Sequence, residues 1–342
     1  MSELISADLF EGPFTTQQAL TAGITYAMLR SAKFEAVFPG RGVWSRARVP
    51  RDLRFWLEAD RLILPQDAAL SHTTGLLAYG VPLSAVGPRH WSTATTVRTA
   101  MPLSLHRVVD LGPVRRVRGF RVVDPSRCLQ GAAPSLCLLD IIRIGDWLLT
   151  KKLITRPELR ASSKVAGAAR VRQAECWMRV GSESFRETSV RTILRLAGLP
   201  NPQVNPNIVD AQGNFVARGD LPYPQWKVLV EYDGWHHERS ASQRQEDIER
   251  REKLDRLGWR SVVLTSRDHD DPPALVNRVW TMLKLQGYRG PAPLFDHERW
   301  ARLTEVPRKS GSRVSGSRTS APSSDTGLSI QAATGTRLRD TA

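Results

Sequence analysis

Three carboxylates close together in the sequence, Asp220, Glu231 and Asp233, could bind a hard divalent cation. Glu231 and Asp233 end the otherwise apolar run KVLVEYD, and because they are two residues apart on a predicted strand, both point to the same face. Carboxylates that converge at one sheet edge repel one another unless a cation lies among them. Mg²⁺ prefers oxygen ligands and takes its remaining ligands from water or a phosphate substrate. We therefore expect a Mg²⁺ site, with Mn²⁺ as the alternative ion, whose ligands are Asp220, Glu231 and Asp233.

Two other residues could take part in chemistry at this edge. Glu187 lies on the predicted helix before the first strand and could reach the edge, although a solvated surface carboxylate is the alternative interpretation. His237 follows Gly234 and His236, and it could orient or deprotonate a water molecule; a surface pair of histidines is the alternative. The expected catalytic residues are therefore Glu231, Asp233, His237 and Glu187.

Helix and strand patterns between residues 182 and 285 would position these side chains. Asp220 and Glu231 are expected at neighbouring strand ends, on either side of the connection LPYPQW. The first three strands can pair as a meander, and the fourth can join by a right-handed crossover. The expected elements are a helix over Glu183–Ala197, strands over 203–209, 214–220 and 227–233, a helix over Ser242–Leu257, a strand over 259–266 and a helix over Pro273–Leu285.

The polar helix SQRQEDIERREKLDRL carries several basic residues that could contact a phosphate backbone, and we single out Arg250 and Arg251. A solvated helix with i,i+4 ion pairs is the alternative interpretation of such a charge run. Its inner, apolar stripe is expected to consist of Ile248, Leu254 and Leu257.

Residues 14–46 have the pattern of a small winged helix-turn-helix. Thr15 or Thr16 can cap a first helix that ends at Gly23, and Thr25 can cap a second helix, TYAMLRSA. The run FEAVFPGRGVW then predicts two short strands around a Pro-Gly turn, which is the place of a wing. A generic helical cap is the alternative. The expected core of this module is Ala19, Leu20, Ile24, Met28 and Leu29.

A DNA-binding module of this kind needs basic residues on its second helix and in its wing. Arg30 and Arg41 occupy these places and are the expected nucleic-acid contacts there. Helix-turn-helix proteins often dimerise to match palindromic sites, so a homodimer is also expected as an option.

Composition agrees with a soluble protein that binds a polyanion. The chain has 342 residues, 49 Lys and Arg against 34 Asp and Glu, and a net charge of +15. An apolar content of 41% is ordinary for a globular protein, and no stretch approaches the roughly 20 apolar residues of a membrane span. The acidic N-terminus does not resemble a signal peptide, and the three cysteines form no CxxC pair. We therefore expect a cytoplasmic protein with DNA as its partner and no membrane association.

The C-terminal segment 308–342 contains no aromatic residue and few aliphatic ones, so we expect a disordered basic tail. His72 and His106 are far apart in the sequence and are expected to be separate structural residues rather than metal ligands.

The N-terminal part resembles AbiEi-type antitoxins and repressors. The similarity is carried by FTTQQALTAGITYAMLRSAKFEAVFPGRGVW, ALSHTTGLLAYGVPL and FRVVDPSRCLQGAA, and it covers about the first 150 residues. It implies a winged helix with an extension, and a toxin or another defence-system protein as a partner.

The C-terminal part is similar to the very-short-patch-repair-like endonuclease domain of the PD-(D/E)xK superfamily. The similarity covers about residues 183–285 and is carried by RGDLPYP, VLVEYDGWHH and QEDIERREKLDRLGWRSVVLTS. It implies a restriction-endonuclease-like fold in which the matching functional residues are Glu187, Asp220, Glu231, His237 and Asp247. Asp233 stands where the superfamily has a lysine, and the zinc-binding cysteines of the repair enzymes are missing.

These features predict an α+β protein in which an N-terminal winged helix-turn-helix precedes a nuclease domain with an αβββαβ core. The expected segments are residues 1–48 (winged helix), 49–180 (α/β extension), 181–290 (nuclease domain) and 308–342 (tail). The expected activity is Mg²⁺-dependent hydrolysis of DNA phosphodiester bonds by an endonuclease. The alternatives are a non-catalytic DNA-binding regulator or antitoxin with a degenerate nuclease domain, and an RNA nuclease.

Overall fold

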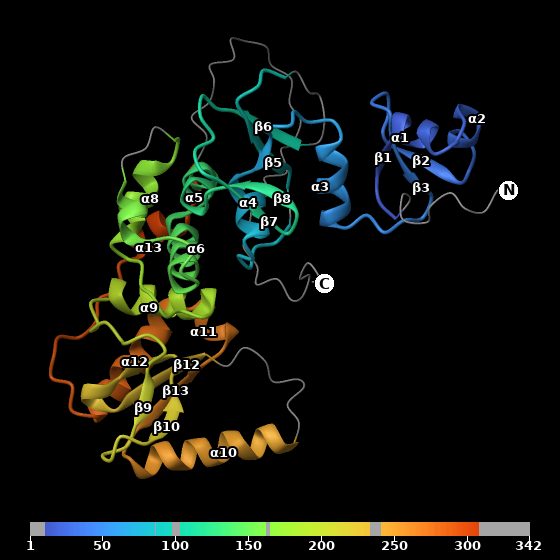
Figure 1. The fold of residues 1–342 in the computed structure, drawn as a ribbon. Helices are drawn as coiled ribbons and strands as arrows, with labels where there is room; N and C mark the ends of the chain where they lie inside the picture. Colours follow the sequence, from blue (N-terminus) through green and yellow to red (C-terminus); the bar gives the residue numbers. More distant parts are fainter. Residues whose placement is uncertain (1–10, 86, 98–102, 162–164, 233–240, 308–342) are drawn as a thin grey trace, which may run out of the picture. The chain divides into compact units, whose positions relative to one another are not determined.

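The computed structural model describes residues 11–85, 87–97, 103–161, 165–232 and 241–307, with side chains from residue 245 in the last range. These residues form a mixed α/β protein with two compact units, divided between Asp124 and Pro125 (Figure 1). Asp233, His237 and the tail 308–342 lie outside the described residues. No helix of the described part is long and apolar enough to cross a membrane.

Unit 1 begins with two short helices and a hairpin. Its first elements are β1 (Phe14–Thr15), α1 (Thr16–Thr21), α2 (Tyr26–Leu29), β2 (Phe34–Phe38) and β3 (Val43–Arg46). The strands pair in the order β1-β3-β2.

Local capping explains where these two helices begin. The Thr15 side chain accepts a hydrogen bond from the Gln18 backbone N–H at 3.1 Å, and the Thr25 side chain accepts one from Met28 at 3.2 Å. The predicted caps are therefore confirmed. Helix α2, however, ends at Leu29 with Arg30 as its C-cap, so it has a single turn and is shorter than predicted.

The core of this module differs from the predicted one. Ala19, Ile24 and Leu29 are buried as predicted, together with Phe14, whose strand β1 was not predicted. Leu20 is only half-buried, and Met28 is 43% exposed. Because α2 makes a single turn, it can bury only one narrow stripe, and Leu29 occupies that stripe.

The rest of unit 1 is a five-stranded mixed sheet with the order β6-β5-β4-β8-β7. Strands β5 and β6 are parallel, and so are β4 and β8. The elements are α3 (Leu53–Arg61), β4 (Ala69–Leu70), α4 (His72–Ala78), β5 (Arg89–Thr93), β6 (Leu103–Arg107), β7 (Val114–Val117) and β8 (Phe120–Val123).

Unit 2 combines a helical part with a small sheet. The helical part comprises α5 (Pro125–Ala132), a 3-10 turn (Ala133–Ser135), α6 (Leu138–Thr150), α7 (Arg156–Arg160), α8 (Ala168–Glu175) and α9 (Phe185–Leu196). Within this part, α6 is joined to α9 by a buried ion pair, in which Arg191 lies 2.6 Å from Asp146. The boundary between the units therefore falls inside the segment expected as an extension, because α6 packs on α9.

The remaining elements of unit 2 form the sheet and its cover. They are β9 (Asn207–Val209), β10 (Phe215–Arg218), β11 (Leu221–Tyr223), a 3-10 turn (Pro224–Trp226), β12 (Val228–Tyr232), α10 (Ala241–Arg256), β13 (Arg260–Leu264), α11 (Ser266–Asp270), α12 (Pro272–Leu285) and α13 (His297–Thr304).

The predicted three-strand meander is wrong. Strands β9 and β10 form a separate antiparallel pair, and the sheet has the order β11-β12-β13, with β11 antiparallel and β13 parallel to β12. The segment LPYPQW, which was expected as a connection, contains strand β11. Pro222 is tolerated there because β11 is an edge strand, where a missing N–H costs no ladder hydrogen bond.

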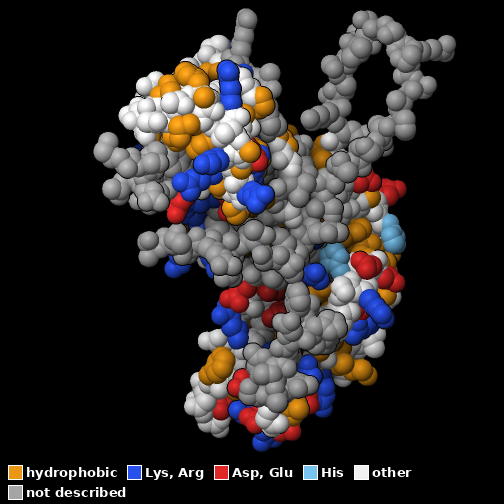
Figure 2. All heavy atoms as spheres, turned by 90° about the vertical axis from the view of Figure 1, so that its right-hand side faces the viewer, with side chains coloured by type: hydrophobic (Ala, Val, Ile, Leu, Met, Phe, Trp, Pro, Cys, Tyr) orange, Lys and Arg blue, Asp and Glu red, His pale blue; other side chains and the backbone are white. Residues whose placement is uncertain are grey.

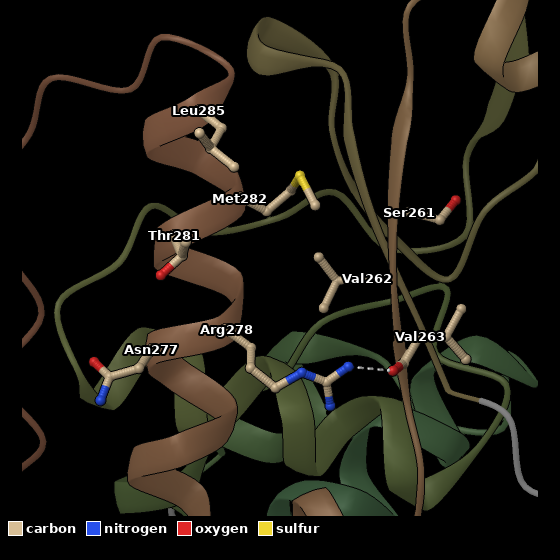
Figure 3. Close-up of a pocket in the computed structure, with 8 residues that line it drawn as sticks. All are labelled: Ser261, Val262, Val263, Asn277, Arg278, Thr281, Met282 and Leu285. Atoms are coloured by element: carbon tan, nitrogen blue, oxygen red, sulfur yellow. Dashed lines mark hydrogen bonds between the residues drawn. The ribbon is translucent and has the colours of Figure 1, made fainter.

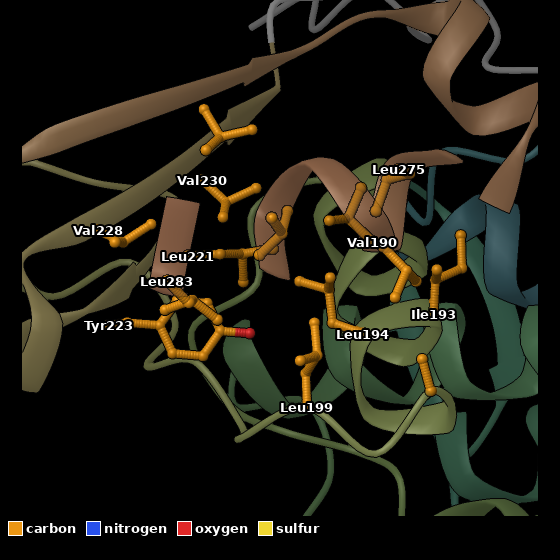
Figure 4. Close-up of a cluster of buried hydrophobic side chains, with 14 of the residues drawn as sticks. Val190, Ile193, Leu194, Leu199, Leu221, Tyr223, Val228, Val230, Leu275 and Leu283 are labelled. Carbon is orange, nitrogen blue, oxygen red and sulfur yellow. The ribbon is translucent and has the colours of Figure 1, made fainter. Parts of the chain in front are cut away.

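Alternation along β12 divides the sheet into two faces. Val228 and Val230 face α9 and α12, in the core shown in Figure 4. Leu229 points the other way and packs with Leu254 of α10 and Trp259. The predicted inner stripe of α10 is therefore correct for Leu254 and for Leu257, which packs against the same cluster, but not for Ile248, which is 50% exposed.

Candidate metal and nucleic-acid site

Asp220 and Glu231 lie opposite each other at one end of the β11–β12 pair. In this antiparallel register Leu221 pairs with Val230, so the preceding Asp220 faces the following Glu231. The backbone N–H of Tyr232 donates to Asp220 Oδ2 over 3.0 Å. Glu231 has the same parity as Leu229, so its side chain lies on the face that α10 covers. The structure thus brings together two of the three predicted metal ligands.

Glu187 lies near these two carboxylates and is buried, with an exposed fraction of 7%. It stands in the first turn of α9, where its backbone N–H donates to the side chain of the N-cap Ser184 at 3.1 Å. Asn205 connects it to Asp220: the Asn205 side-chain amide donates to Glu187 Oε2 at 2.6 Å, and its backbone N–H donates to the Asp220 carbonyl at 2.9 Å. The helical acid therefore belongs to the same cluster.

The electrostatics of this cluster favour a positive charge. Burial, first, and then the negative charges of Glu187 and Glu231 together raise the pKa of Asp220 to about 7, whereas the Arg250 guanidinium opposes the shift. The cluster therefore favours a proton on Asp220 or a further positive charge beside it. Such a raised pKa next to convergent carboxylates is typical of functional sites.

Arg250 already supplies one positive charge to this cluster. It forms an ion pair with Glu231 and donates a second hydrogen bond, 3.0 Å long, to the carbonyl of Arg218. The sequence predicts Arg250 as a contact to the phosphate backbone and does not indicate its ion pair with Glu231. The strand pattern could have revealed this ion pair. Glu231 is two residues from Leu229, so its side chain points toward α10 rather than toward α9.

A second arginine, Arg186, fixes the strand end from the other face. Its guanidinium lies 4.8 Å from the centre of the Tyr232 ring and donates to the Tyr232 hydroxyl. Tyr232 in turn holds Asp220 through its backbone N–H. Arg186 was not predicted, because nothing in its sequence position links it to Tyr232.

A groove of about 290 Å³ lies between β10 and α10, and it is linked to the carboxylates through Arg250, which lines it and pairs with Glu231. Three cations line it: Arg218, Arg250 and Lys253. Glu246 and Glu249 also contribute, so the groove has charges of both signs. Acidic and basic side chains likewise alternate over the lower part of the surface drawn in Figure 2. Arg251, the other predicted contact on α10, is exposed.

A larger cavity of about 540 Å³ lies between β13 and α12 and is a poor candidate for the same chemistry (Figure 3). Its single charged lining residue, Arg278, donates to the Val263 carbonyl at 2.9 Å and pairs with Asp268. No carboxylate lines it.

In unit 1 the two predicted nucleic-acid contacts are both exposed. Arg30 caps the C-terminus of α2, and Arg41 lies in the turn between β2 and β3. The structure thus places them at the second helix and at the hairpin tip, as the sequence predicts.

Among the described residues, one group of three possible ligands has all its ligand atoms within 4.8 Å of one another: His72, His90 and His106. The expectation that His72 and His106 are separate from each other is therefore wrong, whereas their structural role stays a prediction. The ligand oxygens of Glu187, Asp220 and Glu231 do not all lie within 4.8 Å of one another.

Comparison of the chain with models of known protein families, with curated proteins and with solved structures finds no match.

Proposed function

We propose that unit 2 is a divalent-metal-dependent nuclease domain and that the N-terminal module of unit 1 binds DNA. The observation that carries the proposal is the position of Asp220 opposite Glu231, with the buried Glu187 in the same cluster, since carboxylates gathered at one strand end are stabilised by a positive charge. Oxygen ligands of this kind suit Mg²⁺ or Mn²⁺.

Asp220 and Glu231 would hold the ion, and Glu187 would add negative charge behind them. A bound Mg²⁺ lowers the pKa of a ligand water and polarises a phosphate oxygen. The Tyr232 N–H keeps the Asp220 carboxylate oriented toward the strand end. Asp233 and His237 follow this strand end in the sequence and stay predictions as a third ligand and as the residue that assists the water.

Arg250 has two roles in this proposal. Without a metal ion it compensates the charge of Glu231. With an ion bound, the guanidinium is no longer needed there and can turn to a phosphate in the adjoining groove, which Arg218 and Lys253 also line. A cation at this place would stabilise the charge that develops on the phosphate during hydrolysis.

The N-terminal module supports DNA as the substrate. Two short helices followed by a hairpin, with Arg30 and Arg41 exposed on them, form the pattern of a small winged helix. Such a module would deliver the nuclease domain to duplex DNA through phosphate contacts.

One observation favours a second function, a DNA-binding regulator without catalysis. Arg250 occupies the position of a cation at Glu231, and Asp233 stands in place of the usual lysine. A site that has lost its metal could be stabilised in this way. The regulator would bind DNA as tightly as the nuclease but would leave it intact.

Incubation of the full-length chain with supercoiled plasmid, in Mg²⁺, in Mn²⁺ and in chelator, separates the two functions. Nicking or linearisation that requires the ion supports the nuclease. Asp220→Asn should abolish it, whereas Asp255→Asn, the same change at an exposed position of unit 2, should not. Retarded but intact plasmid in all three buffers supports the regulator, and single-stranded RNA as a second substrate tests the RNA nuclease.

A further inference from the structure

Three histidines meet in unit 1, far from the carboxylates in the sequence. His72 begins helix α4, His90 lies on β5 and His106 on β6. The parallel register pairs Ser92 with His106, so His90 and His106 are two positions apart on neighbouring strands. All three are half-buried, which leaves the cluster partly open to solvent.

The nitrogens of the cluster are already close together. His90 Nδ1 lies 2.9 Å from His106 Nε2, and the rings of His72 and His106 stack with their centres 3.7 Å apart. Two nitrogens of a tetrahedral Zn²⁺ site, each about 2.0–2.1 Å from the ion, lie roughly 3.3 Å apart. The three rings are stacked, with angles of 15° to 18° between their planes, so ion binding requires the rings to turn until their nitrogens point at one centre.

The backbone around His72 supports a role beyond packing. His72 has φ of +49°, a left-handed conformation that is strained for a residue with a side chain. Strain of this kind points from an observed outlier to a functional constraint. Here it places the His72 ring against His106.

A polar shell is also present behind His72. His72 Nδ1 lies 2.9 Å from the hydroxyl of Ser71, which accepts a second bond, also 2.9 Å, from Ser92. When Nε2 binds a metal ion, Nδ1–H donates to a neighbouring oxygen, and such an outer partner fixes the tautomer of a ligand histidine. Ser71 is in the right place for this.

We propose that His72, His90 and His106 form a binding site for Zn²⁺. Imidazole nitrogens suit Zn²⁺ and related late transition ions and not Mg²⁺, so this site and the carboxylate cluster would select different metals. Three protein ligands leave the fourth position to water, which is the arrangement of reactive rather than purely structural zinc. The proposal concerns unit 1 and does not depend on the nuclease function.

Burial and the neighbouring rings prepare these side chains as ligands. Burial lowers the pKa of His72 to about 3 and that of His90 to about 4, and the adjacent histidines act in the same direction. Both rings are therefore neutral near pH 7, the form in which imidazole binds metal.

The test is a calorimetric titration of the metal-free, full-length protein with Zn²⁺ and, separately, with Mg²⁺. His106→Gln removes one ligand, and His72→Asn removes another while keeping a residue that tolerates positive φ. His297→Gln, an exposed histidine of unit 2, is the matched control. Circular dichroism checks that each variant is folded.

We expect the parent and His297→Gln to bind one more Zn²⁺ than the two cluster variants, or to bind it at least about tenfold more tightly. Mg²⁺ should not compete with Zn²⁺ for the three-histidine site. The proposal is overturned if the parent binds no Zn²⁺, or if a folded His72→Asn or His106→Gln protein binds it like the control.

Discussion

The backbone N–H of Tyr232 donates to the carboxylate of Asp220 over 3.0 Å, and this bond ties the start of β11 to the end of β12. It uses only one carboxylate oxygen, Oδ2, and directs the side chain toward the strand end where Glu231 lies. The same bond would couple the proposed metal site to folding, because any loss of β11–β12 pairing also separates the two proposed ligands.

The first prediction concerns pH in metal-free buffer. The pKa of Asp220 is about 7 in the folded chain against 3.8 for an ordinary aspartate, so the folded state holds a proton that the unfolded state releases near pH 4. Stability from this group is therefore greatest below pH 4 and falls as the pH rises toward 7. Asp220→Asn should remove this dependence and raise the Tm above neutral pH by about 2–4 °C, the shift expected for about 1 kcal/mol.

Thermal unfolding of unit 2, followed between pH 4 and 8 in the presence of chelator, measures this effect. Asp255→Asn is the control, and it should follow the parent curve at every pH. Added Mg²⁺ should stabilise the parent at pH 8 and leave Asp220→Asn unchanged. Equal pH profiles for the parent and Asp220→Asn would contradict the assigned charge cluster.

The second prediction concerns Arg250. Arg250→Gln removes the cation that competes with a metal ion at Glu231, so Mg²⁺ should bind more tightly. The cleavage rate should nevertheless fall by about tenfold or more, because a charge near the phosphate is lost. Arg256→Gln, an exposed change on the same helix, should alter neither quantity. Weaker Mg²⁺ binding in Arg250→Gln would refute the competition.

The third prediction concerns the N-terminal module. Arg30→Gln and Arg41→Gln should each weaken binding to duplex DNA and reduce the salt dependence of the binding constant by about one unit of slope. The exposed Arg54, which pairs with Glu58 on α3, provides the control as Arg54→Gln. Binding measured by fluorescence anisotropy over a range of salt concentrations gives the slopes. An unchanged slope in both module variants would exclude this surface.

The fourth prediction concerns the link between α6 and α9. Asp146 and Arg191 are both almost fully buried, so Asp146→Asn leaves a buried charge without its partner and should cost about 3–5 kcal/mol of the free energy of unfolding. Arg218→Gln breaks an exposed pair with Glu183 and should cost no more than about 1 kcal/mol. Denaturant unfolding of both variants decides this. Similar losses would mean that α6 is not part of the folded core of unit 2.

Local signals predicted the features that depend on a few neighbouring residues. Thr15 and Thr25 cap helices because a hydroxyl two or three positions before the bonded N–H satisfies it in any context. Asp220 and Glu231 converge as predicted, and the apolar run KVLVEYD is enough to predict the strand that carries Glu231. The strand that brings Asp220 to this place, β11, was expected as a connection.

Features that depend on distant partners were not predictable in this way. The sequence predicts a connection at β11, because a proline such as Pro222 usually argues against a strand. That β11 is an edge strand follows only from the order of strands in the sheet. The sequence does not predict a role for His90. Its position beside His72 and His106 depends on the pairing of β4, β5 and β6. Arg250 was assigned to DNA, because a charge run does not reveal which of its members faces a carboxylate.

The most direct measurement of the central claim is the number of Mn²⁺ ions bound, counted by electron paramagnetic resonance of the free ion, in the parent, Asp220→Asn and Asp255→Asn. Comparing stoichiometries cancels any ion held elsewhere in the chain, including at the three histidines. We predict that the parent and Asp255→Asn bind one more Mn²⁺ than Asp220→Asn, and that Mg²⁺ displaces this ion. Equal stoichiometry in all three proteins would contradict the proposed metal site at Asp220 and Glu231.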